Sequence, residues 1–347
     1  MSSIFSTKET GGFANNLAYA VVAQGVGLLS SVLTSLILPK FLGVEDYAYW
    51  QLFLLYASYA GFALLGINDG VYLRLGGKRY AELDFGRLKG QALVVLTSQL
   101  LVAAACLAGV FAMGADPNRT AVFCLVVLYG LLSNLTLFLR YVFQCTNLTR
   151  ISSFSDLLSK GLFIVCMLAL LVVGVDGYLP FVAFYATCQA LSLLYVLACA
   201  REVISSKATI RGVFRACASD VRAGMKVMVA YYADSLVVGF TRMLTDARMG
   251  LAVFGKLSLS FSLTNFFLTF IGQVAMVAFP VLKRLDPSQQ REKYAYIRRV
   301  LHIILPAIYL AYVPIRYILV LWLPDYGESF VYLSLIHISE PTRPERI

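Results

Sequence analysis

The sequence predicts an all-α membrane protein with several spanning helices, and three observations support this fold class. Hydrophobic residues make up 59% of the 347 residues and charged residues only 14%, whereas soluble domains have about 45–50% and about 25%. The apolar residues come in runs close to the roughly 20 residues that a helix needs to cross a hydrocarbon core. The Lys and Arg residues gather in alternate connections between these runs, as membrane topology requires.

Nine apolar runs are expected to cross the membrane completely, and a tenth begins after Pro324. The tenth run is short, because its apolar part covers only Phe330 to Ile336. The predicted spans lie near residues 15–38, 47–65, 91–113, 120–143, 154–173, 180–200, 221–242, 251–282 and 300–323.

The distribution of positive charge predicts the orientation. Most of the 29 Lys and Arg residues lie in the connections after the second, fourth, sixth and eighth runs, and Lys160 is counted in the second of these connections. Short basic connections stay in the cytoplasm, so we expect a cytoplasmic N-terminus. The net charge of +10 is then a topological signal, and we expect no nucleic-acid partner.

The basic segment from Arg201 to Arg215 divides the chain after six runs. The turn after the first run is echoed by the turn after the seventh, which predicts two related six-helix lobes, as in transporters built from repeats. We expect residues 1–200 to form the first lobe and residues 201–336 an incomplete second lobe. Residues 337–347 resemble a non-native tail.

The motifs of several enzyme classes are missing from the sequence. It contains no phosphate-binding G-x-x-x-x-G-K-[ST] loop, its two histidines are His302 and His337, and its seven cysteines lack metal-ligand spacing. The connections are too short to fold into a separate domain. We therefore expect a protein that is not an enzyme and that uses no cofactor and no metal.

Polar side chains recur on one face of three predicted helices. Within hydrocarbon such residues face a partner or a water-filled cavity, so the three stripes predict one central, hydrated cavity. Hydrogen bonds between helices without a cavity explain the same pattern, and this alternative stays open. The lining residues are expected to be Gln24 and Ser31, then Ser133 and Gln144, then Ser262 and Asn265.

Charged residues near the spans give a second signal. Asp234 is expected to be the one acid well inside a helix; it is either the static partner of a cation or a proton acceptor. The cations outnumber it, which favours an anionic cargo, although each cation could instead extend to the lipid headgroups. The cations expected in the cavity are Arg74, Arg140, Arg242, Lys256 and Arg316.

Several stretches resemble the bacterial polysaccharide-biosynthesis flippases of O-antigen and capsule assembly. They cover residues 36–47 (LILPKFLGVEDY), 65–74 (LGINDGVYLR), 224–228, 254–259, 279–284 and 323–326. Arg74, Arg242 and Lys256 fall within or beside these stretches, whereas Asp234 stands where the family would have a small or polar residue.

This resemblance implies the fold of the multidrug/oligosaccharidyl-lipid/polysaccharide exporter superfamily, with two six-helix lobes around a cavity that opens alternately to each side. It also implies transport of an undecaprenyl-diphosphate-linked oligosaccharide to the outer leaflet of the bacterial cytoplasmic membrane, for surface polysaccharide biosynthesis. The expected partners are this lipid-linked oligosaccharide, membrane lipids and a glycan polymerase.

Two other functions compete with this one. A cation-coupled multidrug exporter of the same fold would favour acids and aromatic pockets over cations. A membrane enzyme of glycan assembly would carry a sizeable loop with acids or histidines, and the sequence has no such loop. A passive assembly scaffold also stays open.

Overall fold

The computed structural model describes residues 9–112, 114, 116–265, 299, 317, 319–327 and 329, with side chains from residue 18 onward and without that of Asp234. Within these ranges all regular structure is helical. The chain divides into two compact units. Unit 1 comprises Met1–Ser30 and Tyr49–Met249, and unit 2 comprises Ser31–Ala48 and Gly250–Ile347.

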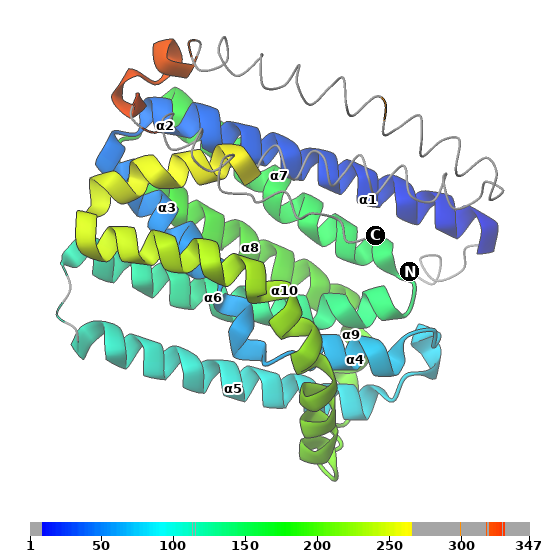
Figure 1. Ribbon diagram of the computed structural model, residues 1–347. Coiled ribbons are helices and arrows are strands. Elements are labelled where there is room, and N and C mark those ends of the chain that lie inside the picture. The colour runs from blue at the N-terminus through cyan, green and yellow to red at the C-terminus, as the bar shows by residue number, and fades with distance from the viewer. Residues whose placement is uncertain are drawn as a thin grey trace. The chain divides into compact units, whose positions relative to one another are not determined.

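The helices follow one another with short connections (Figure 1). Their bounds are α1 Glu9–Val32, α2 Leu38–Phe41, α3 Val44–Ser58, α4 Ile67–Leu75, α5 Phe85–Ala112, α6 Pro117–Cys145, α7 Thr149–Val173, α8 Leu179–Cys199, α9 Arg201–Ser205 and α10 Val213–Met249. Four shorter turns are η2 Leu33–Ile37, η3 Ala60–Leu64, η4 Tyr80–Glu82 and η5 Pro324–Tyr326. Residues 251–265 are also helical.

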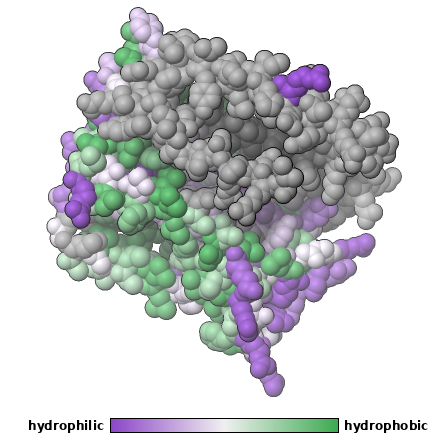
Figure 2. Space-filling model, in the orientation of Figure 1, coloured by the Kyte–Doolittle hydropathy of each residue, from purple (hydrophilic) through white to green (hydrophobic). Residues whose placement is uncertain are grey.

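The helices confirm an all-α protein suited to cross a membrane several times. In the part of the chain that the structure describes, five helices are long and apolar enough to span a bilayer, or up to seven if each of two bent pairs forms one span. Large apolar side chains face outward, with Leu101 72%, Val172 88% and Phe240 69% exposed. Figure 2 shows apolar side chains over most of the described face and hydrophilic ones at its margins. Such a surface fits lipid better than water.

Several helices begin earlier than the apolar runs because polar residues cap them. The Asp84 carboxylate accepts a hydrogen bond from the backbone N–H of Arg87, and Asp116 accepts one from the backbone N–H of Arg119. These caps satisfy amide groups that have no partner within the helix. α5 and α6 therefore include basic first turns that the hydropathy pattern places in connections.

In unit 1, α6 packs against α4, α5, α7 and α8, and α7 packs along α8 (Figure 1). Small polar residues allow the last pair to approach closely: the hydroxyl groups of Ser155 and Ser192 lie 2.6 Å apart, and Ser192 also donates to the carbonyl of Ser155. Close packing by small residues is typical of helices in lipid, where apolar burial gives no net attraction.

The predicted second span is broken. Its two parts, Val44–Leu64 and Ile67–Leu75, are inclined at 55° to each other. Leu65 and Gly66, with φ of 51° and 77°, form the left-handed step between them. The expectation that Arg74 lies in a connection is therefore wrong, because the chain becomes helical again at Ile67 and Arg74 lies on α4.

The break frees backbone carbonyl groups that two buried amides satisfy. Gln99 on α5 donates to the carbonyl of Ala63 at 2.9 Å, and Asn134 on α6 donates to that of Ala60 at 2.8 Å. Asn134 also donates to the Gln99 side chain at 2.7 Å. Irregular backbone at membrane depth requires such partners, because lipid offers none.

Unit 2 combines residues 31–48 with later parts of the chain. A π-helical turn precedes Pro39, which cannot donate to a carbonyl of the preceding turn. Lys40 donates to the carbonyl of Trp322 at 3.0 Å and lies over its ring. The ring of Tyr47 packs edge-on against that of Tyr326 at 5.8 Å.

The predicted spans at 251–282 and 300–323 and the start of a tenth lie partly or mainly outside the described residues. The nine-helix count, the two six-helix lobes and the boundary at residue 200 stay predictions.

Candidate functional site

α10 is bent, like the segment from α3 to α4. Its parts Val213–Ala233 and Ser235–Met249 are inclined at 54°. The bend contacts the break after α3: the Tyr59 hydroxyl donates to the carbonyl of Ser235 at 2.6 Å, and the ring of Phe62 stacks on that of Tyr232 at 4.1 Å. Two interrupted helices thus meet where each departs from regular geometry.

Asp234 lies at this bend, between the two parts of α10. Its side chain lies outside the described part of the structure. Its expected role in ion coupling stays a prediction.

Glycines bring the backbones of α4 and α10 into contact on the N-terminal side of the bend in α10. A methyl group on Gly224 would overlap the carbonyl oxygen of Gly66, and one on Gly70 would overlap the carbonyl oxygen of Asp220. Gly66 also adopts a left-handed backbone conformation, with φ of 77°, which glycine accepts more easily than other residues. The spacing of Gly66 and Gly70 is the small-x-x-x-small pattern of close helix crossings in membranes.

One turn further along α4, an ion pair holds the same crossing. Arg74 Nε and Nη2 donate to the two carboxylate oxygens of Asp220 at 2.8 and 2.9 Å. Gln91 on α5 accepts from Arg74 at 3.0 Å and donates to Asp220 at 2.6 Å. Because Asp220 and Gln91 are buried, the pair is a bidentate, enclosed contact between three helices.

The exposed part of Arg74 faces a cavity of about 130 Å³ at the ends of α4 and α5. The cavity has mixed charge, since it is lined by Arg74, Lys78, Arg87, Glu82 and Asp84 among other residues. Because Asp220 also binds Arg74, the three cations at this cavity face three carboxylates, which leaves it no excess of positive charge to bind an anion.

A second cavity, of about 100 Å³, lies between α6, α7 and α8, and we call it the polar pocket. Each of the three helices contributes one polar face at helical spacing. Its lining residues are Tyr129, Ser133, Thr136, Leu137 and Arg140 from α6, Asp156, Ser159 and Lys160 from α7, and Tyr185 and Gln189 from α8.

Arg140 is neutralised within the polar pocket. Its guanidinium group forms a two-pronged ion pair with the carboxylate of Asp156, and its Nε donates to the hydroxyl of Ser152 at 3.0 Å. Gln144 donates to the same hydroxyl at 2.8 Å. The predicted face of Ser133, Arg140 and Gln144 is thus one face in the structure, with Gln144 just outside the pocket.

The polar pocket contains a second cation, Lys160. Lys160 was expected in a connection, but it lies within α7, two turns after Ser152 and one turn after Asp156. The recurrence of Ser152, Asp156 and Lys160 every four residues at the start of an apolar run is the signal that identifies this face.

Aromatic rings form one wall of the polar pocket. Tyr185 packs against Tyr129 and Phe163, with ring centres at 5.4 and 4.8 Å. Trp50 stacks on Phe163 and meets Tyr185 edge-on at 5.6 Å. This wall joins α3 to the three helices around the pocket.

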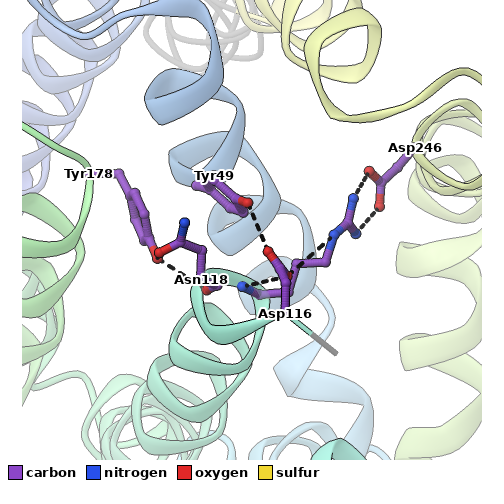
Figure 3. Close-up of polar contacts among 6 residues, drawn as sticks. Tyr49, Asp116, Asn118, Tyr178 and Asp246 are labelled. Atoms are coloured by element: carbon purple, nitrogen blue, oxygen red, sulfur yellow. Dashed lines mark hydrogen bonds and ion pairs between the residues drawn. The ribbon is translucent and has the colours of Figure 1, made fainter. Parts of the chain in front are cut away.

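A third polar cluster lies where α6 begins and α10 ends (Figure 3). Arg119 donates to both carboxylate oxygens of Asp246 at 2.7 Å. Asp116 accepts from the Tyr49 hydroxyl at 3.0 Å, and Tyr178 donates to the backbone carbonyl of Asn118 at 3.1 Å. An ion pair therefore holds α10 near each of its ends, to Arg119 here and to Arg74 at the glycine crossing.

Acids other than Asp234 also lie on the described helices, nearer to their ends. Asp156, Asp220 and Asp246 lie on α7 and α10, and each binds an arginine. Asp69 on α4 is a fourth acid, and it interacts electrostatically with Tyr141. Counting charges along the sequence missed them because they lie near the ends of apolar runs.

The remaining predicted residues lie elsewhere. Arg242 donates to the side chain of buried Gln51 at 3.1 Å, and Gln24 is exposed on α1. Within unit 1, Arg74, Arg140 and Arg242 thus occupy three separate places. In unit 2, Ser31, Lys256 and Ser262 are half-buried and Asn265 is exposed, while Arg316 lies outside the described residues.

No family model, curated protein or solved structure matches the chain. The resemblance to polysaccharide flippases therefore depends on the quoted stretches alone, and the function is inferred from the residues and their geometry.

Proposed function

We propose that this protein is a membrane transporter that carries a lipid-linked oligosaccharide, bound through its diphosphate, from the cytoplasmic to the outer leaflet of the bacterial cytoplasmic membrane. The observation that carries this proposal is the contact between the two interrupted helices at Tyr59 and Ser235. Interrupted helices recur at the sites of secondary transporters, where they provide polar backbone groups and points of movement.

The negative charge of a diphosphate is complementary to the positive charge found among the apolar helices. A diphosphate joined to a glycan cannot cross hydrocarbon unaided, because burying an unpaired charge costs many kcal/mol. The polar pocket has two cations and one carboxylate in its lining. A polar path with positive charge lowers that barrier, while the polyprenyl chain can stay in lipid.

A cation-coupled multidrug exporter is the second candidate, and one observation favours it. Asp69 lies on α4, three residues after the break at Gly66, and no described residue forms an ion pair with it. An acid beside an interrupted helix that lacks a cationic partner among the described residues is suited to bind a proton or a cationic drug.

Reconstitution of the 347-residue chain in vesicles separates the two candidates. Fluorescent lipid-linked oligosaccharide placed in one leaflet is expected to become accessible to a quencher on the other side, faster than in empty vesicles. A cationic dye with a proton gradient serves as the second substrate. Dye movement without oligosaccharide movement would reject the proposal in favour of the exporter.

Variants connect the measured transport to the contact of the two interrupted helices. Tyr59→Phe removes the hydrogen bond to Ser235 and is expected to change the transport rate severalfold, whereas Tyr231→Phe, on an exposed residue of α10, should leave it unchanged. Asp69→Asn and Asp234→Asn test coupling: loss of gradient dependence in one of them identifies the coupling acid. Equal rates for wild type and Tyr59→Phe would remove the contact from the mechanism.

A further inference from the structure

The polar pocket contains two hydrogen-bond donors whose partners are absent from the described part of the chain. Neither the ammonium group of Lys160 nor the side-chain amide of Gln189 forms a hydrogen bond or an ion pair with any residue that the structure describes. Both side chains line the same cavity, from α7 and α8. Two unused donors that face one space are suited to an acceptor that the protein does not supply.

The acids around the polar pocket do not balance Lys160. Among the described residues, Asp156 is the one acid in its lining, and both of its oxygens bind the guanidinium group of Arg140. The described lining therefore has one positive charge in excess. An uncompensated charge among apolar helices is costly, so such groups pair with a counter-ion or reach water.

A glycine on another helix makes room for the ammonium group of Lys160. Its Nζ atom lies 3.2 Å from the point where a Cβ atom on Gly27 of α1 would be. The ammonium group thus lies close to the Gly27 backbone, and any larger residue at position 27 would crowd it. The cavity of about 100 Å³ is the volume of about three water molecules.

We propose that the polar pocket is a binding site for one small inorganic anion, held by the ammonium group of Lys160 and the amide of Gln189. Halide ions and inorganic phosphate share the required chemistry. Each is a compact anion that accepts hydrogen bonds from the two donors of the pocket. The Arg140–Asp156 pair positions α6 against α7 and makes no net contribution to the charge. The same positive charge supports the proposed transport, but binding of an inorganic anion goes beyond that transport and is tested without the cargo.

The test measures unfolding temperature for the purified 347-residue chain at constant ionic strength. Sodium gluconate is replaced stepwise by sodium chloride, bromide or phosphate. For the wild type we expect a saturable rise of several degrees with a small anion, because a ligand that binds only the folded state stabilises it. Saturation separates binding from the general stabilisation by excluded salts.

Lys160→Gln is expected to abolish the saturable rise, and Lys160→Arg to retain it. Lys226→Gln is the matched control, since Lys226 is an exposed lysine on α10. Gln189→Leu should weaken the apparent affinity about tenfold, which gives a second test if Lys160→Gln fails to fold. An equal response to gluconate and small anions in the wild type, or an undiminished rise in Lys160→Gln, would overturn the proposal and leave a pocket filled by water.

Discussion

The glycine crossing of α4 and α10 and the polar pocket between α6, α7 and α8 both contain an Arg–Asp pair inside an apolar bundle. At the crossing, backbone meets backbone and the Asp220 side chain is only 3% exposed. In the polar pocket, the Asp156 side chain is 30% exposed beside a cavity of about 100 Å³. The same two residue types are thus enclosed in one region and partly solvated in the other.

This difference shows that the surroundings of an ion pair decide its role. At the crossing, the Asp220 carboxylate has almost no access to water, so removal of Arg74 leaves a buried charge that keeps only the hydrogen bond from Gln91. Beside a cavity, water or a ligand can replace a lost partner. The crossing is therefore expected to fix helix positions, and the pocket to tolerate exchange of its contents.

The largest expected effect is that of Gly224→Ala at the crossing. The added methyl group overlaps the carbonyl of Gly66, which is backbone and cannot rotate away, so we expect a loss of more than about 3 kcal/mol in the free energy of unfolding. Gly109→Ala on α5 is the matched control, because nothing lies within 4 Å of its added methyl group. Denaturant titration of both variants measures the difference. Similar stability for the two would show that α4 and α10 do not cross as described.

The second effect compares the two carboxylates. Asp220→Asn leaves Arg74 without its charged partner, and we expect it to destabilise by about 2–4 kcal/mol; the 33% exposure of the Arg74 side chain keeps the loss below that of a fully buried pair. Asp156→Asn should cost about 1 kcal/mol, because the cavity hydrates Arg140. The pairwise energies follow from double-mutant cycles with Arg74→Met and Arg140→Met. A larger coupling energy for the pocket pair would reverse this order.

Much of the fold was predictable from the sequence, because an apolar run long enough to cross a membrane is recognised from its own residues alone. The structure has helices along the first seven predicted spans, which it describes apart from Met113, and two of these spans are bent. The predicted face of Ser133 and Arg140 also lines a cavity. Helical spacing determines such a face without any knowledge of neighbouring helices.

The partners of charged residues could not be predicted, because they come from distant parts of the sequence. Arg74 pairs with Asp220 across 146 positions, and Arg119 with Asp246 across 127. The continuation of the second span beyond Gly66 was missed for a related reason. The left-handed turn there lies against Gly224 on α10, and no local pattern reveals that contact.

The third effect concerns the amides that satisfy the break after α3. Asn134→Leu keeps the volume and removes the donor to Ala60, so we expect a loss of about 1–3 kcal/mol from an unsatisfied carbonyl. Thr97→Val is the control, since the exposed Thr97 hydroxyl bonds only within its own helix, and it should change stability by less than about 0.5 kcal/mol. Thermal unfolding in detergent measures both variants. A neutral Asn134→Leu would mean that water reaches the break.

The smallest expected effects come from replacing the two cations of the polar pocket, Arg140 and Lys160. The two substitutions should change the free energy of unfolding in opposite directions. Arg140→Met leaves Asp156 unpaired and removes the bond to Ser152, so it should destabilise by about 1–2 kcal/mol. Lys160→Met removes a charge that has no protein partner among the described residues, and it replaces an ammonium group with an apolar side chain of similar length. In gluconate, without small anions, Lys160→Met should therefore be neutral or stabilising by up to about 1 kcal/mol. The unfolding temperature of both variants in that buffer tests this expectation. Equal destabilisation by the two substitutions would show that Lys160, like Arg140, serves the packing of the helices rather than the contents of the pocket.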